Sequence, residues 1–236
     1  MRVAYLTNQY PKTSHSFIRR EIAGVEAAGI EVLRYSVRET SEPLVDPRDI
    51  AEGERTSVLL DRGALGLGVS FFAALVTRPA RVVRALRAAI ALSRPSNRGL
   101  LVHLAYLAEA CRLRGRLERA GAQHLHVHFA TNAASVALLC RELGGPTFSF
   151  TVHSTLSAEE PRSNAIATKL AAAEFACAVS RHGLDVLRSL APADRQARLL
   201  LVRCGVDEEF LDAKPTPLSA RPRLVCVARF SPEKGH

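Results

Sequence analysis

The chain has 236 residues, of which 47% are hydrophobic, and this composition excludes an intrinsically disordered protein because it can form a sizeable core. Its formal net charge of +9 favours anionic partners, whether phosphorylated ligands, nucleic acid or an acidic lipid surface. The five cysteines are scattered singly, which argues against a disulfide framework and a cysteine-based zinc site.

The first forty residues predict a strand, a helix and a second strand. Residues 3–6 form an apolar run too short and too closely followed by polar residues for a signal peptide, so we expect a buried strand in a cytosolic protein. Ser16 is predicted to cap a helix that continues to Gly29, and residues 30–37 predict the next strand. This order is typical of a parallel sheet covered by helices.

Residues 39–55 are polar and contain two prolines, so we expect a loop there, followed by about seventy mostly helical residues. The uncharged stretch 63–77 is shorter than the roughly 20 apolar residues of a membrane-spanning helix, and we expect a buried or surface-lying helix. The next helix carries a basic band, formed by Arg78, Arg81, Arg84 and Arg87.

The alternation of strands and helices resumes at residue 124. Strands are predicted at residues 124–129, 147–152, 175–179 and 199–202, with helices at 132–143, at 163–173 and from about Arg181. The fold class is therefore α/β, a Rossmann-like parallel sheet with helices on both faces. We expect this domain to span residues 1–211, a proline-rich linker to span 212–222, and a second domain to begin at 223–236 with a strand at 224–228.

Ligands of open parallel sheets collect beyond the carboxyl ends of the strands, so polar residues at those positions are candidates for a site. Ser14, His15 and Ser16 follow the first strand and lie at a helix amino terminus, where free N–H groups favour anions and hydroxyl oxygens. A helix cap without ligand contacts explains the same residues equally well.

Three further histidines fall at the same edge. His126 and His128 project from one face of their strand, and since no third metal ligand lies near them in the sequence we expect no metal site. His153 follows the strand at 147–152 and either donates a hydrogen bond to a sugar hydroxyl or closes a loop.

Several catalytic motifs are absent. The sequence has no G-x-G-x-x-G after the first strand, no G-x-S-x-G, no P-loop and no D-x-D pair, which disfavours dehydrogenases, hydrolases of the α/β type and metal-bound diphosphate chemistry. Arg229 and Lys234 lie near the end of the chain in a turn that suits either a diphosphate or plain solvation.

Read in chain order, several segments resemble glycosyltransferase family 4, the retaining enzymes of the GT-B fold, and particularly the branch that builds bacterial capsule, exopolysaccharide and lipopolysaccharide sugars. The segments that carry the resemblance are Tyr10-Pro11, Ser16-Phe17-Ile18 through Glu21-Ile22, His126-Val127-His128-Phe129-Ala130, Phe150-Thr151-Val152-His153, Val179-Ser180, Cys204-Gly205-Val206-Asp207 with Phe210, and residues 227–235.

The resemblance implies an acceptor-side domain and a donor-side domain that face a cleft. It implies that His153 lies by the transferred sugar, that Arg229 and Lys234 neutralise the leaving diphosphate of a nucleotide-sugar, and that no metal or other cofactor takes part. It further implies that most of the donor domain would lie beyond His236, so we expect this chain alone to transfer no sugar.

Other hypotheses remain. One is a non-catalytic basic module that binds an anionic membrane surface or nucleic acid, and another is an inactive remnant of an interrupted gene. Nucleic acid is disfavoured because only 6% of the residues are aromatic, which leaves few stacking side chains. An anionic membrane suits the basic band beside the apolar stretch, and it would place the protein peripherally at the inner face of the membrane.

Overall fold

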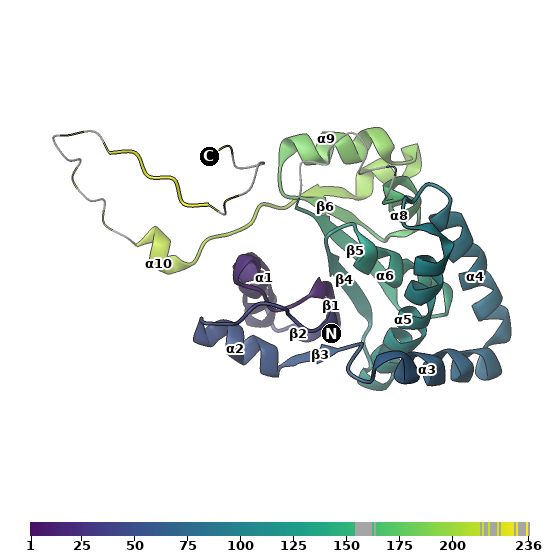
Figure 1. Cartoon of the computed structure of the whole chain (residues 1–236). Coiled ribbons are helices and arrows are strands. Elements are labelled where there is room, and N and C mark those ends of the chain that lie inside the picture. Colours follow the sequence, from purple (N-terminus) through teal and green to yellow (C-terminus); the bar gives the residue numbers. More distant parts are fainter. Residues whose placement is uncertain are drawn as a thin grey trace. The chain divides into compact units, whose positions relative to one another are not determined.

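A computed structural model describes residues 1–153, 162, 164–212, 214, 217, 221, 223–228, 230 and 235. Up to residue 201 its strands are separated by helices, and three helices follow one another between residues 63 and 120 (Figure 1). The strands are β1 (Arg2–Gln9), β2 (Glu31–Arg38), β3 (Thr56–Val58), β4 (His124–His128), β5 (Thr147–Val152), β6 (Ala176–Ala178) and β7 (Leu199–Leu201). The helices are α1 (Ser16–Ala27), α2 (Pro47–Glu54), α3 (Gly63–Thr77), α4 (Pro79–Ser93), α5 (Gly99–Ala120), α6 (Asn132–Glu142), α8 (Ile166–Ala172), α9 (Arg181–Leu190) and α10 (Glu208–Leu211), with 3₁₀ turns at Thr13–His15 and Ala193–Arg198.

The strands form one parallel sheet in the order β3-β2-β1-β4-β5-β6-β7. The chain winds outward from β1 to β3 on one side and from β4 to β7 on the other, so the winding direction changes between β1 and β4. At such a switch point the connections after the two strands leave in opposite directions and open a crevice at their carboxyl ends. The predicted α/β fold class is confirmed.

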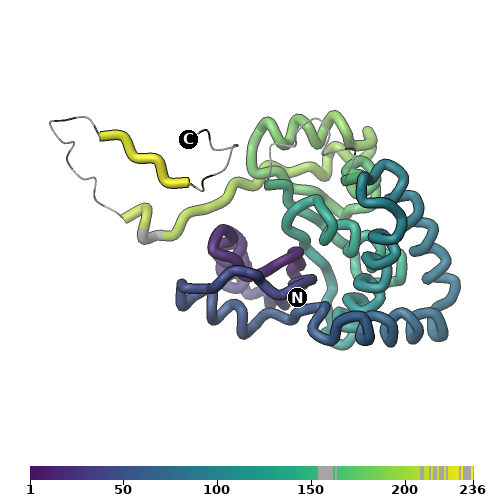
Figure 2. The backbone as a smooth tube through the Cα atoms, in the orientation of Figure 1, coloured from purple at the N-terminus to yellow at the C-terminus, as the bar shows by residue number. Residues whose placement is uncertain are grey.

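The two faces of the sheet bury different side chains. Ala4, Leu6, Leu125 and Val127 point into the larger core, where they pack with helices α3 to α6, α8 and α9. On the opposite face Tyr5 packs with α1 in a smaller apolar cluster. Figures 1 and 2 show α1 on one side of the sheet and α3 to α6 on the other. Because side chains alternate along a strand, the three histidines of β4 lie on the α1 face.

Two local expectations from the sequence were wrong. Ser16 is not a side-chain cap: a 3₁₀ turn precedes α1, and the helix begins at Ser16 itself without a capping hydrogen bond. Residues 39–55 are not all loop, since α2 begins at Pro47. Asp46 caps this helix by accepting a hydrogen bond from the Arg48 backbone N–H at 2.8 Å, and proline is favoured at the first helical position.

Residues 1–205 form one compact unit, and residues 206–236 form a second. Residues 223–228 are not part of this sheet and are not in a strand, although the sequence predicts a strand at 224–228. None of the helices in the described ranges is both long enough and apolar enough to cross a membrane.

Candidate functional site

Histidines from three separate parts of the chain meet at the carboxyl edge of the sheet, beside the switch point. His15 follows β1, His128 ends β4 and His153 follows β5. The His15 and His153 rings both contact the ring of Phe129, with centroid separations of 5.4 and 5.1 Å. His128 and His153 are joined by a hydrogen bond of 2.9 Å between Nδ1 of the first and Nε2 of the second. The sequence-based expectation of convergence is therefore met.

Two phenylalanines form the apolar walls of this histidine cluster. Phe17, in the first turn of α1, lies 4.5 Å from the ring of His153, and Phe129 contacts Phe17 at 6.4 Å between centroids. Phe129 has a positive φ of 72°, and its backbone N–H donates to the Thr151 carbonyl at 2.9 Å. This backbone conformation directs the chain away from β4 and keeps the aromatic ring at the edge of the sheet.

Glu21 approaches the histidines from α1. Its Oε1 atom lies 3.6 Å from Nε2 of His128 and 3.9 Å from Nε2 of His126, and it accepts a hydrogen bond of 2.9 Å from the Tyr5 hydroxyl. The expectation that no third metal ligand lies near the two histidines was wrong, because Glu21 supplies one from a distant part of the sequence.

This three-residue group nevertheless fits a metal poorly. Both ring nitrogens of His126 already bond to hydroxyls, Nδ1 to Ser149 at 2.8 Å and Nε2 to Thr151 at 2.9 Å. A metal ligand must offer a free nitrogen lone pair, which leaves one imidazole and one carboxylate, fewer than the three protein ligands of a catalytic zinc site. Hydrogen bonding between neighbouring strands accounts for His126.

Burial keeps the imidazoles neutral. Desolvation lowers the pKa of His15 and of His153 to about 4. The charge of Lys12 adds to the effect at His15, and repulsion from a protonated His15 would add to it at His153. Burial also holds the pKa of His128 well below its usual range. Neutral imidazoles each offer one hydrogen-bond donor and one acceptor, so the cluster suits uncharged hydroxyl groups better than phosphates.

The other residues that the sequence predicts for the site are Ser14, Ser16, Arg229 and Lys234. Ser14 is exposed, and Ser16 is half-buried at the start of α1. Arg229 and Lys234 lie outside the described residues. The carboxyl end of β1 and the start of α6 are joined by a hydrogen bond of 2.6 Å from the Asn132 side chain to the Asn8 side chain.

Sequence reasoning missed Phe17, Glu21 and Phe129 as parts of the site. One signal was available: residues four apart in a helix share a face, so Phe17 and Glu21 both point from α1 toward the same strand ends. Phe129 directly follows His128, but nothing in its residue type indicates the positive φ.

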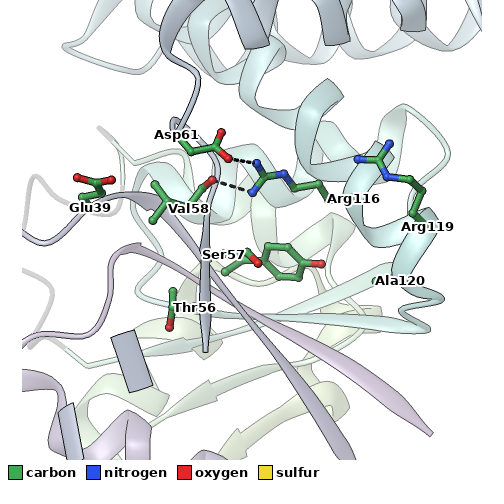
Figure 3. Close-up of a pocket in the computed structure, with 9 residues that line it drawn as sticks. Glu39, Thr56, Ser57, Val58, Asp61, Arg116, Arg119 and Ala120 are labelled. Carbon is green, nitrogen blue, oxygen red and sulfur yellow. Dashed lines mark hydrogen bonds and ion pairs between the residues drawn. The ribbon is translucent and has the colours of Figure 1, made fainter. Parts of the chain in front are cut away.

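A separate pocket of about 660 Å³ lies along the edge strand β3 and does not include any of the predicted site residues. Figure 3 shows Arg116 reaching across it to the Asp61 carboxylate and the Val58 carbonyl, at 2.8 and 2.7 Å. These bonds hold the Arg116 guanidinium against the protein's own groups.

Comparison with known proteins agrees with this fold. A search of curated proteins finds no match to the chain. A sequence profile described as Glycosyltransferase Family 4 matches residues 61–210, more than half of the 236 residues, and the matched region includes His126, His128 and His153. A parallel Rossmann-like sheet is also the architecture that the resemblance predicted. The chain belongs to glycosyltransferase family 4.

Proposed function

We propose that the chain is the acceptor-side part of a retaining glycosyltransferase that transfers a sugar from a nucleotide-sugar to a saccharide or lipid-linked acceptor in the synthesis of cell-surface polysaccharide. The observation that carries the proposal is the meeting of His15, His128 and His153 at the switch point of the sheet. Neutral imidazoles can hydrogen-bond to the hydroxyls of a sugar, and phenylalanine rings can pack against its apolar C–H faces.

Charge stabilisation is assigned to other residues. In this proposal Arg229 and Lys234 neutralise the leaving diphosphate while the glycosidic bond breaks, and no metal is needed. His153 lies beside the transferred sugar, and Ser14, His15, Ser16, His126 and His128 build or support the acceptor side of the cleft. His126 does so indirectly, because both its nitrogens bind neighbouring strand residues.

Acceptor binding is the direct test of this assignment. Titration of the purified chain with lipid-linked and soluble saccharides, followed by ligand-observed NMR, should show binding that His153→Ala weakens about fivefold, the effect of one neutral hydrogen bond of roughly 1 kcal/mol. His182→Ala is the matched control, because His182 is exposed on α9 and distant in sequence from the cluster. Equal affinity of the two variants would refute the role of His153.

We also propose that the polypeptide of 236 residues transfers no sugar by itself, because its large packed unit, residues 1–205, carries the acceptor-side residues but not Arg229 and Lys234. The test is incubation with a panel of nucleotide-sugars and saccharide acceptors. Turnover within tenfold of a full-length family member would contradict this part of the proposal and leave the binding test standing.

We also propose that α3 rests on an anionic membrane surface. This helix has no charged residue in its fifteen, yet Leu65 is 80% exposed and Phe72 66% exposed, and Val69 and Val76 are exposed on the same stripe. Large exposed apolar stripes are rare on soluble monomers and mark interaction surfaces. Arg81 and Arg87 are exposed on α4, whereas Arg78 and Arg84 pair with Glu118 and Glu142.

A groove between α3 and α5 supports the choice of an anionic lipid as the partner. It has a volume of about 690 Å³, with Leu65 and Val69 on its apolar side and Arg62 and Arg119 among its polar residues. Acyl chains and a phosphate headgroup would satisfy these two kinds of side chain together.

Liposome flotation tests the membrane proposal. Recovery with phosphatidylglycerol vesicles in low salt should fall strongly in the Leu65→Ser/Phe72→Ser variant, and the control Val45→Ser, which removes an exposed valine from the segment before α2, should behave as the unchanged chain. Arg81→Glu/Arg87→Glu should abolish the preference for anionic over neutral vesicles. Equal flotation with both lipids in the unchanged chain would overturn the proposal.

A further inference from the structure

Three side chains form a row from α1 along one face of the sheet to its carboxyl edge. Glu21 Oε1 faces Nε2 of His128 at 3.6 Å, and Nδ1 of His128 is hydrogen-bonded to Nε2 of His153 at 2.9 Å. Nδ1 of His153 then remains on the outer side of the row, with the exposed Cys204 sulfur 3.9 Å away. The His128 side chain is fully buried, and none of the described residues hydrogen-bonds to its Nε2 atom.

The Tyr5 hydroxyl sets the direction of this row. Tyr5 donates to Glu21 Oε1 at 2.9 Å, and burial raises the pKa of Tyr5, so it remains a donor. Glu21 Oε1, which accepts from the tyrosine, remains an acceptor both when the carboxyl group is ionised and when Oε2 carries a proton. A lone pair on His128 Nε2 would therefore face a second lone pair in a buried place, which is unfavourable. The proton of His128 must lie on Nε2.

The places of the remaining ring protons follow from this assignment. A neutral imidazole carries one N–H, so Nδ1 of His128 is an acceptor. The hydrogen bond between the two rings requires a donor on the other side, and this donor is Nε2–H of His153. The remaining nitrogen of His153, Nδ1, consequently carries a lone pair, which also suits the weakly donating thiol of Cys204.

We infer that His128 is a positioning residue that, oriented by Glu21 and Tyr5, fixes His153 in the tautomer with its proton on Nε2, so that Nδ1 of His153 accepts a hydrogen bond from a donating sugar hydroxyl. The ligand contact rests on the proposed function, whereas the tautomer does not. The sequence alone suggested the opposite direction, with His153 as the donor. No proton is transferred in this arrangement; it selects for ligands that carry a free hydroxyl at the contacted position.

The tautomer is tested by long-range ¹H–¹⁵N NMR of the full chain labelled at histidine, with signals assigned from the His153→Gln and His128→Gln variants. We expect His153 and His128 to carry their ring protons on Nε2 at neutral pH. Glu21→Gln should leave both tautomers unchanged, because the amide oxygen still accepts from Tyr5. His128→Leu should release His153 into the tautomer mixture of a solvated imidazole.

A proton on Nδ1 of His153 in the unchanged chain would overturn the inference, as would a single fixed His153 tautomer in a folded His128→Leu variant. Should His128→Leu fail to fold, the spectrum of the unchanged chain still decides. For a saccharide that binds the chain, the hydroxyl that donates to His153 Nδ1 can be replaced by fluorine, which accepts hydrogen bonds but does not donate them. This replacement should weaken binding about as much as His153→Ala does. Absence of any saccharide binding would count against the proposed function and leave the tautomer result intact.

Discussion

Lys169 on α8 donates hydrogen bonds from its side-chain nitrogen to the backbone carbonyl of Ala130, at 2.7 Å, and to that of Thr131, at 2.8 Å. The lysine is only 1% exposed, and no described carboxylate pairs with it. Burial accordingly lowers its pKa to about 7. The bonds fasten the loop between β4 and α6, which carries Phe129, to a helix almost forty residues further along the chain.

Lys169→Met should lower the free energy of unfolding by about 1–3 kcal/mol, because a side chain of similar length leaves the buried Ala130 carbonyl without its donor. Urea titration measures the loss. Lys214→Met, at an exposed lysine, is the control and should change stability by less than about 0.5 kcal/mol. Equal stability of the two variants would contradict the fastening role.

Two glycines give a matched test of packing. A Cβ atom added at Gly145 would lie 2.7 Å from the Cys140 sulfur and 2.8 Å from the Cys140 carbonyl oxygen, so Gly145→Ala should cost about 1–3 kcal/mol. At Gly24 on α1 no described atom beyond the backbone of α1 lies within 4 Å of such a Cβ, and Gly24→Ala should stabilise the chain by up to about 1 kcal/mol through helix propensity. Thermal unfolding of both variants gives the sign of each change in stability. A destabilised Gly24→Ala variant would contradict the free space that the structure shows around Gly24.

The buried Arg34 should matter far more than the exposed Arg55, although both pair with Glu26 and Glu52. Arg34→Met leaves Glu52, itself buried, without its main partner and should cost about 3–5 kcal/mol. Arg55→Met removes a surface pair and should cost less than about 1 kcal/mol. Because Glu52 also accepts from the Tyr10 hydroxyl at 2.7 Å, the Arg34 variant should increase hydrogen exchange in the loop after β1. Similar losses of unfolding free energy in the Arg34→Met and Arg55→Met variants would contradict the greater importance of the buried arginine.

Stability should decrease as the pH falls from about 6.5 toward 4. The pKa of His15 and of His153 is about 4 in the folded chain, below the ordinary value of about 6.5, so the unfolded state binds more protons in this window. Each such proton corresponds to at most about 1.4 kcal/mol per pH unit. Glu109 acts in the opposite sense, because burial raises its pKa to about 7 and the folded state then binds the extra proton.

The check is a series of urea midpoints between pH 7 and pH 4.5. His153→Gln should flatten the fall, whereas Glu109→Gln should steepen it. A midpoint that rises on acidification in the Glu109→Gln variant, which lacks the opposing contribution of Glu109, would show that the histidines are not held neutral by the fold.

The sheet was largely predictable because its signal is local. The apolar runs of β4 and β5, the helical spacing of α6 and the start of α9 at Arg181 all appear where the sequence places them. Helix α2 was missed because Pro47 resembles a loop signal, and only its position after the capping Asp46 shows that it starts a helix. Short strands were predicted one or two residues too long, as at β6 and β7.

The site was predictable only in part. Positions at strand ends follow from the alternation of elements, which is how His15, His128 and His153 were found. The contact of Glu21 with His128 depends on how α1 packs across β1 and β4, and these residues are more than a hundred positions apart in the sequence. No periodicity encodes such a contact.

Selection for stability and selection for sugar binding should favour different residues at position 129. A bulky residue with φ 72° carries a backbone penalty of about 1–2 kcal/mol that glycine would avoid. Selection for heat resistance alone should therefore drift toward glycine at this position, whereas selection for sugar recognition should retain the ring that lies against His15 and His153. A library randomised at position 129 and sorted under each pressure would separate the two demands that the fold places on one residue.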